Sequence, residues 1–142
     1  MTTDFADAHH RHLKDADTLY SAQRWANADH LYGLSAECGL KALMILFGMP
    51  APNGEPKDPL DRVHVNYLRP NKVNVWVRYE TYRSTYQAIN YPLSPTNPFA
   101  NWDVNQRYEH QINFTQQLVD PHKQGAVSVK TLITQAQQDG LI

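Results

Sequence analysis

Residues 24–44 read RWANADHLYGLSAECGLKALM, and this stretch decides the fold. Its apolar side chains recur at steps of three and four residues on two adjacent ridges, which indicates an α-helix with neighbours on two sides. A helix that is apolar around most of its circumference belongs in the middle of a bundle. We therefore predict a central helix over residues 24–48, ended by Gly48. Gly33 and Gly39 within it favour the close approach of another helix or of a partner subunit.

The central helix also carries ionisable side chains, which on a buried element must be paired, exposed along a seam or used for function. Glu37 and Lys41 stand four residues apart, in the favourable order for an intrahelical ion pair. Two interpretations of this pair are open. In one, it is a packing-seam ion pair joined by Arg78 or Arg83 of a third helix. In the other, Lys41 or Arg78 contacts a phosphate group of a ligand.

Helical periodicity continues on both sides of this stretch. A first helix is predicted over residues 4–20, and a short turn at residues 21–23 returns the chain antiparallel into the central helix. A third long helix is predicted over residues 72–88. A short helix over residues 61–68, ended by Pro70, is predicted to precede it.

The last helix has a recognisable start signal. Asp120 is a good N-cap, and Pro121 suits the first helical position. Before it, Asp103 is a candidate N-cap for a further short helix that contains Arg107 and His110. The sequence therefore predicts an all-α fold, an antiparallel helical bundle of four to five helices with two long proline-rich loops.

Composition fits one globular domain spanning residues 1–142. Charged residues make up 19%, hydrophobic residues 42%, and the formal net charge is -1, which is unlike a disordered chain. The near-zero charge argues against a purely electrostatic binder of nucleic acid, although it leaves room for a local basic pocket. A signal peptide and an apolar run of membrane-spanning length are both missing, so we expect a cytoplasmic protein that is not bound to a membrane.

Cysteine and histidine usage bears on metal binding. Cys38 is the only cysteine, which excludes an internal disulfide and a cysteine-rich zinc site, and we expect it to be a buried packing thiol. His9, His10 and His12 cluster on the first helix, but metal sites draw ligands from several elements. We interpret these histidines as a partly exposed cluster and expect no metal and no cofactor.

The segment Ala36–Leu43 has the pattern Ala-Glu-x-x-Leu-Lys-Ala-Leu late in the second of two antiparallel helices. In this it resembles the HEPN superfamily, and the preceding residues 24–30 look like the start of the corresponding family helix. The likeness covers about the first third of the chain. It implies a small helical bundle that commonly forms a homodimer. Many HEPN proteins are RNA-cleaving toxins or defence nucleases, and others are thought to bind nucleotides.

The nuclease members of the family share an Arg, a polar residue and, after four to six intervening residues, a His near the start of a late helix. The resemblance implies that the His moves a proton and the Arg holds the phosphate in metal-independent cleavage. Arg24 and His30 have this spacing but lie on the second helix, with Trp25 at the polar position. Arg107 and His110 lie where the motif is expected but stand two residues closer together. These two pairs are the candidate catalytic residues.

Aromatic side chains surround the second pair. Trp102 and Tyr108 offer stacking surfaces, and Asp103 stands four residues before Arg107. One interpretation is a ligand pocket in which Trp102, Asp103 and Tyr108 help to bind a base and Arg107 holds a phosphate. The other is a buried Asp103–Arg107 ion pair that fixes the proline-rich loop to the bundle.

Three functional hypotheses follow. The leading one is a HEPN-like binding or interaction module that binds a nucleotide or RNA as a homodimer. The second is a metal-independent ribonuclease that acts as a toxin or defence effector. The third is a non-catalytic structural subunit that associates with a partner protein. Whether the protein is an enzyme stays open at this point.

Overall fold

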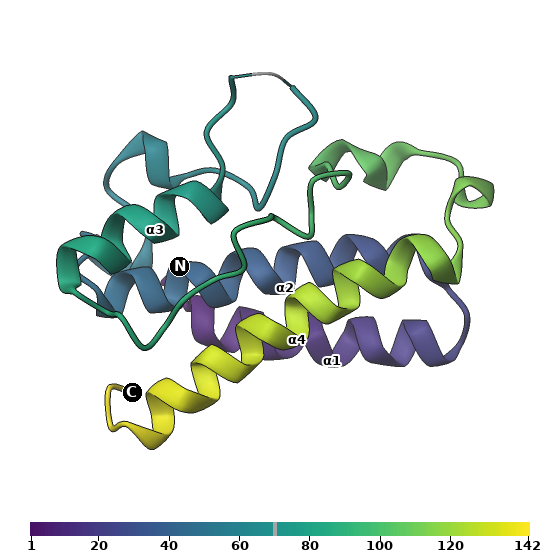
Figure 1. Ribbon diagram of the computed structural model, residues 1–142. Coiled ribbons are helices and arrows are strands. Elements are labelled where there is room, and N and C mark those ends of the chain that lie inside the picture. The colour runs from purple at the N-terminus through teal and green to yellow at the C-terminus, as the bar shows by residue number, and fades with distance from the viewer. Residues whose placement is uncertain (70) are drawn as a thin grey trace.

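The computed structural model describes residues 1–69 and 71–142, which form four α-helices and no β-strand (Figure 1). The α-helices are α1 (Phe5–Ser21), α2 (Trp25–Leu46), α3 (Val75–Tyr86) and α4 (Gln116–Gln138). Four short 3-10 segments lie in the connections: η1 (Pro52–Gly54), η2 (Pro59–Asp61), η3 (Val104–Tyr108) and η4 (Gln111–Asn113). The predicted all-α bundle is confirmed.

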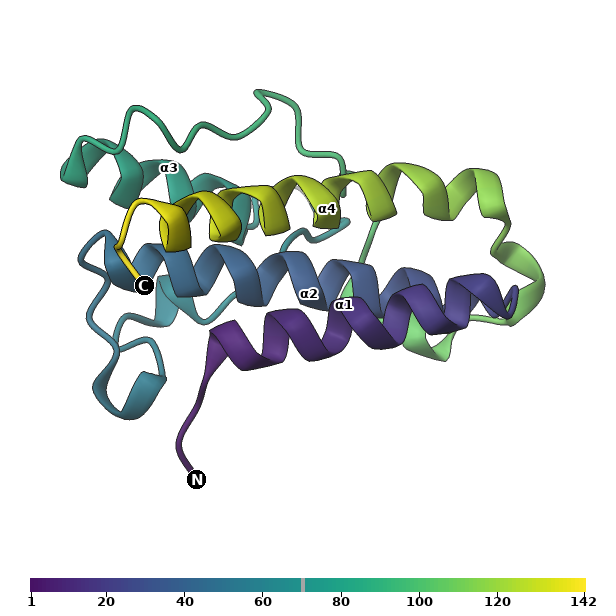
Figure 2. The same cartoon turned by 90° about the horizontal axis from the view of Figure 1, so that it is seen from below.

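The helix α2 lies in the middle of the bundle. Helix α1 runs antiparallel to it, α4 lies along another side in the same direction as α2, and α3 covers its C-terminal half (Figures 1 and 2). The largest apolar cluster contains Leu40 and Leu43 of α2 and the C-cap residue Phe47, together with Tyr79 of α3 and Ile133 of α4. The prediction that the most apolar helix is central is therefore confirmed, since α2 contributes side chains to both apolar clusters.

Two glycines of α2 allow close packing within the chain. A Cβ atom built on Gly33 would lie 2.1 Å from the indole ring of Trp102, and one on Gly39 would lie 2.5 Å from the side chain of Val129 on α4. Both distances are too short for a real contact. Gly33 therefore accommodates the long connection between α3 and α4, and Gly39 accommodates α4 itself.

Helix α4 begins earlier than predicted. Thr115, not Asp120, is its N-cap and accepts a hydrogen bond from the amide of Leu118, so Pro121 lies inside the helix. The carboxylate of Asp120 instead accepts a 2.6 Å hydrogen bond from the Tyr20 hydroxyl. The physical reason is tertiary packing, because the additional turn places Val119 in the apolar cluster between α1 and α2.

The helix predicted over residues 61–68 is also wrong, since only η2 forms there and it ends at Asp61. The following residues pair with the second loop. The Asn66 side chain donates to the carbonyls of Ala100 and Trp102, and the Asn97 side chain donates to the carbonyl of Val65. Pro70, the predicted end of that helix, lies outside the described residues. These long-range bonds replace the local helical ones.

No helix in the described part of the chain combines the length and the apolar character needed to cross a membrane. The same residues hold no group of three or more His, Cys, Asp or Glu side chains suited to a metal ion.

The histidines of α1 differ strongly in environment. His9 is fully buried and bonds through Nδ1 to the carbonyl oxygen of Ser35 at 2.8 Å, while its Nε2 has no hydrogen-bond partner among the described residues. His10 is exposed and His12 is half-buried. The expected partly exposed cluster therefore holds for two of the three residues, and His9 belongs to the core. Burial lowers the pKa of His9 to about 4.

The depressed pKa of His9 predicts acid-sensitive stability. Below pH 6.5 the unfolded chain takes up a proton that the folded chain refuses until about pH 4, so the folded state is progressively destabilised within this window. At about 1.4 kcal/mol per pKa unit the loss amounts to about 3 kcal/mol. His9→Asn keeps a donor for the Ser35 carbonyl without the titration. Denaturant unfolding at pH 7 and pH 4 should therefore show a smaller acid loss for this variant, whereas an unchanged loss would contradict the assignment.

Candidate functional site

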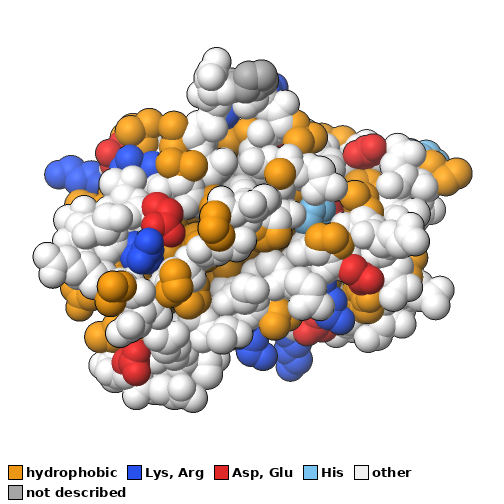
Figure 3. Space-filling model, viewed as in Figure 1, with side chains coloured by type: hydrophobic (Ala, Val, Ile, Leu, Met, Phe, Trp, Pro, Cys, Tyr) orange, Lys and Arg blue, Asp and Glu red, His pale blue; other side chains and the backbone are white. Residues whose placement is uncertain are grey.

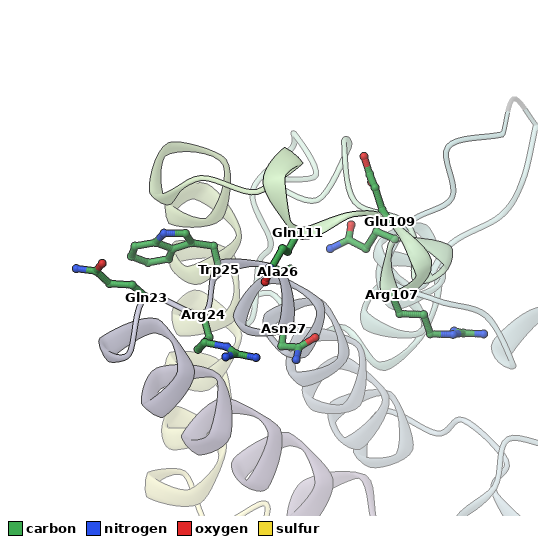
Figure 4. A pocket seen from close by; sticks show the side chains of 9 residues that line it. Gln23, Arg24, Trp25, Ala26, Asn27, Arg107, Glu109 and Gln111 are labelled. Carbon is green, nitrogen blue, oxygen red and sulfur yellow. The ribbon is translucent and has the colours of Figure 1, made fainter.

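A hollow lies between the start of α2 and the segment that contains η3 and η4 (Figure 4). Its volume is about 310 Å³, and it brings together Arg24 and Arg107, one arginine from each candidate pair in the sequence. We call it the arginine hollow and define it by its lining residues Gln23, Arg24, Trp25, Ala26, Asn27, Gln106, Arg107, Glu109 and Gln111.

The α2 side of the arginine hollow is a helix start without a side-chain cap. Gln23 has a positive φ of 59°, which turns the chain sharply out of α1, and Arg24 is the N-cap residue of α2. No side chain caps α2, and the amides of residues 25–27 have no hydrogen-bond acceptor among the described residues. Free amides at the positive end of a helix dipole favour an anion.

The two arginines add positive charge to this helix start. Within the described residues, neither Arg24 nor Arg107 forms an ion pair with a carboxylate. The side chain of Arg24 lies beside Asn27, whereas that of Arg107 is directed away from Arg24 (Figure 4). Arg107 packs over the Tyr108 ring, 4.7 Å from its centroid, and donates a 3.2 Å hydrogen bond to the Val104 carbonyl. Both arginines are exposed, and neither guanidinium is neutralised by a carboxylate within the described residues.

The η3 side of the hollow is fixed by a capping box. The Asp103 carboxylate accepts from the amide of Asn105, and the Gln106 side chain accepts from the amide of Asp103. Asp103 was predicted to cap a helix that contains Arg107, which is confirmed for η3. His110 lies beyond η3, however, and the alternative Asp103–Arg107 ion pair is not among the described contacts. The hydrogen bonds to Asp103 outweigh the effect of its burial and lower its pKa.

The histidines of the two candidate pairs do not line the arginine hollow. His110 is exposed, and its Nδ1 accepts from the amide of Ile112, so the side chain caps η4. His30 stacks on the Trp102 ring with a centroid distance of 6.0 Å, and it does not line the hollow that contains Arg24. Burial, and then the charge of Arg107, lower the pKa of His30. Its Nδ1 is buried without a hydrogen-bond partner among the described residues.

The two aromatic residues proposed for stacking on a ligand differ in their exposure to solvent. Trp102 is completely buried and donates from its indole nitrogen to the Asp29 carbonyl at 3.1 Å, so it cannot stack on a ligand as first expected. Tyr108 is 78% exposed and lies next to Arg107, and it stays available to a ligand.

A second polar cluster lies farther along α2. Lys41 Nζ donates to Glu37 Oε1 at 2.9 Å, and Glu37 Oε2 accepts from His64 Nδ1 at 2.9 Å. Burial by itself raises the pKa of Glu37, but the His64 hydrogen bond and the Lys41 charge together hold that pKa below its usual value. The interpretation of Glu37–Lys41 as a seam ion pair agrees with these contacts, and Lys41 is buried.

The prediction of which side chain joins the Glu37–Lys41 ion pair was wrong. His64, from the loop after η2, occupies the place expected for Arg78 or Arg83. Arg78 instead donates from Nε to Asp61 at 2.7 Å, and Arg83 pairs with Glu80. Arg78 is thus committed to a structural ion pair, as Lys41 is. Cys38 is buried as expected, and burial raises its thiol pKa to about 12.

A third cluster was not predicted. The buried carboxylate of Asp29 bonds to His122 Nδ1 of α4 at 2.5 Å and accepts from Gln106 Nε2 at 2.6 Å. His122 Nε2 in turn lies 2.7 Å from Asn101 Oδ1. The only signal for this cluster in the sequence was a carboxylate on an otherwise apolar helix. Nothing in the spacing could pair it with His122 or Gln106.

The outer surface carries no large basic region on the face seen in Figure 3, where acidic, basic and apolar side chains of the described residues are interspersed. The arginine hollow is lined by Arg24, by Arg107 and by residues 25–27, whose amides have no acceptor among the described residues. Comparison with known protein families, curated proteins and solved structures gave no match for this chain.

Proposed function

We propose that the protein is a HEPN-like binding module that holds a phosphate group of a nucleotide or a short single-stranded RNA in the arginine hollow. The observation that carries this proposal is that Arg24, Arg107 and the uncapped start of α2 all line one hollow. Arginine is well suited to phosphate because its planar guanidinium can donate two parallel hydrogen bonds. Free helix amides recognise the same group.

The size of the hollow fits this ligand class. At about 310 Å³ it lies at the lower end of small-molecule sites, large enough for a phosphate with part of a nucleoside but not for a large cofactor. Gln23, Asn27 and Gln111 provide amide groups that can bond to a sugar or base edge. The exposed ring of Tyr108 beside Arg107 offers a stacking surface for a further base.

The proposal includes a homodimer in the cytoplasm. The resemblance of Ala36–Leu43 to the HEPN helix supports the dimer. Tyr108 and Ile112, each 78% exposed, place apolar surface next to the arginine hollow that a second copy would cover. Sedimentation of the purified protein tests this part. A partner protein that co-purifies stoichiometrically would instead favour the structural-subunit hypothesis.

Removing the two arginines should abolish most of the binding. A hydrogen bond to a charged group contributes about 1.5–3 kcal/mol, so Arg24→Gln and Arg107→Gln should each weaken binding roughly ten- to hundred-fold. The measurement is fluorescence anisotropy with a labelled hexauridylate at low salt. Arg11→Gln is a matched control, because Arg11 is an exposed arginine of α1 outside the hollow.

The salt dependence gives a second readout of the same experiment. Each lost phosphate contact should reduce the slope of log K against log salt by about 0.7 for a single strand. Equal affinities for wild type and both hollow variants would refute the proposal. An equal loss in Arg11→Gln would show that the binding is only non-specific charge attraction.

A metal-independent ribonuclease is the second candidate, and the Glu37–His64 contact favours it. Glu37 bonds to Nδ1 of His64, whose side chain is 35% exposed, and His64 Nε2 has no hydrogen-bond partner among the described residues. A carboxylate-oriented imidazole with one free nitrogen can act as a general base. Recovery of the hexauridylate as cleaved product, lost in His64→Gln, would support this candidate. Intact RNA after prolonged incubation would exclude it for this substrate.

A further inference from the structure

The buried side chain of Asp29 connects three segments that are far apart in the sequence. Its Oδ1 bonds to His122 on α4, its Oδ2 accepts from Gln106 on η3, and its main-chain carbonyl accepts from the Trp102 indole. Asp29 and His122 are both fully buried. Because α2 is the central helix, the hydrogen bonds of Asp29 attach η3 directly to the middle of the bundle.

Gln106 is the link between this buried carboxylate and the arginine hollow. Its Nε2 donates to Asp29 at 2.6 Å, its Oε1 accepts from the amide of Asp103 at 3.2 Å, and it lines the hollow next to Arg107. Both ends of its amide group are thus used, which fixes its orientation. Arg107 itself is held by the Tyr108 ring and the Val104 carbonyl, both within η3. The position of Arg107 therefore depends on the position of η3.

We infer that Asp29 is a positioning residue of the arginine hollow, acting through Gln106 to hold η3 and Arg107 across the hollow from Arg24. This inference rests on the proposed function for its ligand, although the positioning itself is independent of any ligand. Without the Asp29–Gln106 bond, the five-residue η3 keeps its own capping box but loses this contact with α2. The arginine hollow lies between the start of α2 and η3, so the distance between its two sides is then no longer fixed.

The chemistry of the bond allows a swap that separates positioning from general stability. Gln106→Met removes both hydrogen bonds while keeping the length of the side chain. Asp29→Asn replaces one of the two carboxylate oxygens by an amide donor, which opposes the Gln106 donor whenever the remaining oxygen accepts from His122. The double variant Asp29→Asn with Gln106→Glu restores the pattern. Its new amide at position 29 accepts from His122 and donates to the new carboxylate at position 106, which still accepts from the amide of Asp103.

Hydrogen exchange of the segment 103–110 tests positioning without ligand. Gln106→Met should accelerate exchange there by at least about ten-fold, corresponding to about 1.4 kcal/mol, and the double variant should return it towards the wild-type rate. Exchange in α1 should stay unchanged in both. Wild-type exchange in Gln106→Met would overturn the inference.

Anisotropy with the labelled hexauridylate tests the link to binding. Gln106→Met should weaken binding by about ten-fold. Loss of binding in Arg107→Gln but not in Gln106→Met would overturn the inference and leave the proposed function standing. Altered exchange with no binding even by wild type would instead refute the proposed function and leave only the positioning.

Discussion

Asp29→Ala is expected to lower the free energy of unfolding by about 3–5 kcal/mol, because it removes one partner of a buried polar cluster. His122 would lose the carboxylate at its Nδ1 while staying fully buried between α2 and α4. Gln106 would lose its acceptor at the same time. Leaving a buried polar group without a partner costs more than the original bond contributed. Urea unfolding followed by far-ultraviolet circular dichroism measures the change.

Asp15→Ala is the matched control, because Asp15 is an exposed carboxylate of α1 that does not belong to this buried cluster. It should change stability by less than about 0.5 kcal/mol, as ordinary surface substitutions do. A loss in Asp29→Ala no larger than that of the control would mean that water replaces the missing carboxylate, which contradicts the burial described above.

Trp102→Ala should destabilise the protein to a similar extent, by about 3–5 kcal/mol. Trp102 is completely buried, packs against Gly33 and stacks with His30, and its indole nitrogen bonds to the Asp29 carbonyl. The substitution removes this contact area and leaves a cavity beside α2. Tyr108→Ala on the same connection is the control, because Tyr108 is 78% exposed and should contribute little to stability.

A second substitution checks that Trp102 is seated on Gly33. In the wild-type background Gly33→Ala should destabilise, because the added Cβ would lie 2.1 Å from the indole ring. In the Trp102→Ala background the same change should stabilise by up to about 1 kcal/mol, since alanine is the better helix former. Effects of the same sign in both backgrounds would contradict the packing of Trp102 on α2.

The helices were predictable because their signals are local. Apolar spacing identified α2 as the central helix, and the two glycines on it were correctly linked to close packing. Helix boundaries were less predictable where tertiary contacts decide them. Thr115 and Asp120 are both acceptable N-caps, and only the burial of Val119 against α1 and α2 selects the earlier one. The loop after η2 likewise follows its bonds to the second loop and not its own helical tendency.

The site was predictable only in part. Arg24 and Arg107 were both selected from a spacing pattern, and both line the arginine hollow, whereas His30 and His110 do not. A sequence shows partners on one helix, such as Glu37 and Lys41, because their separation fixes their geometry. It cannot show that His64 joins them or that Asp29 meets His122, since those pairs depend on how distant segments fold together.

A nuclear magnetic resonance titration of the ¹⁵N-labelled protein with uridine 5′-monophosphate tests whether the arginine hollow binds phosphate. The phosphate should bind at the uncapped start of α2, where residues 25–27 line the arginine hollow. We therefore predict that the amides of these residues and that of Arg107 shift most and that the shifts saturate. Their amplitude should fall in Arg24→Gln. Saturable shifts centred elsewhere, or no shifts at residues 25–27, would contradict the assignment of the arginine hollow as the phosphate site.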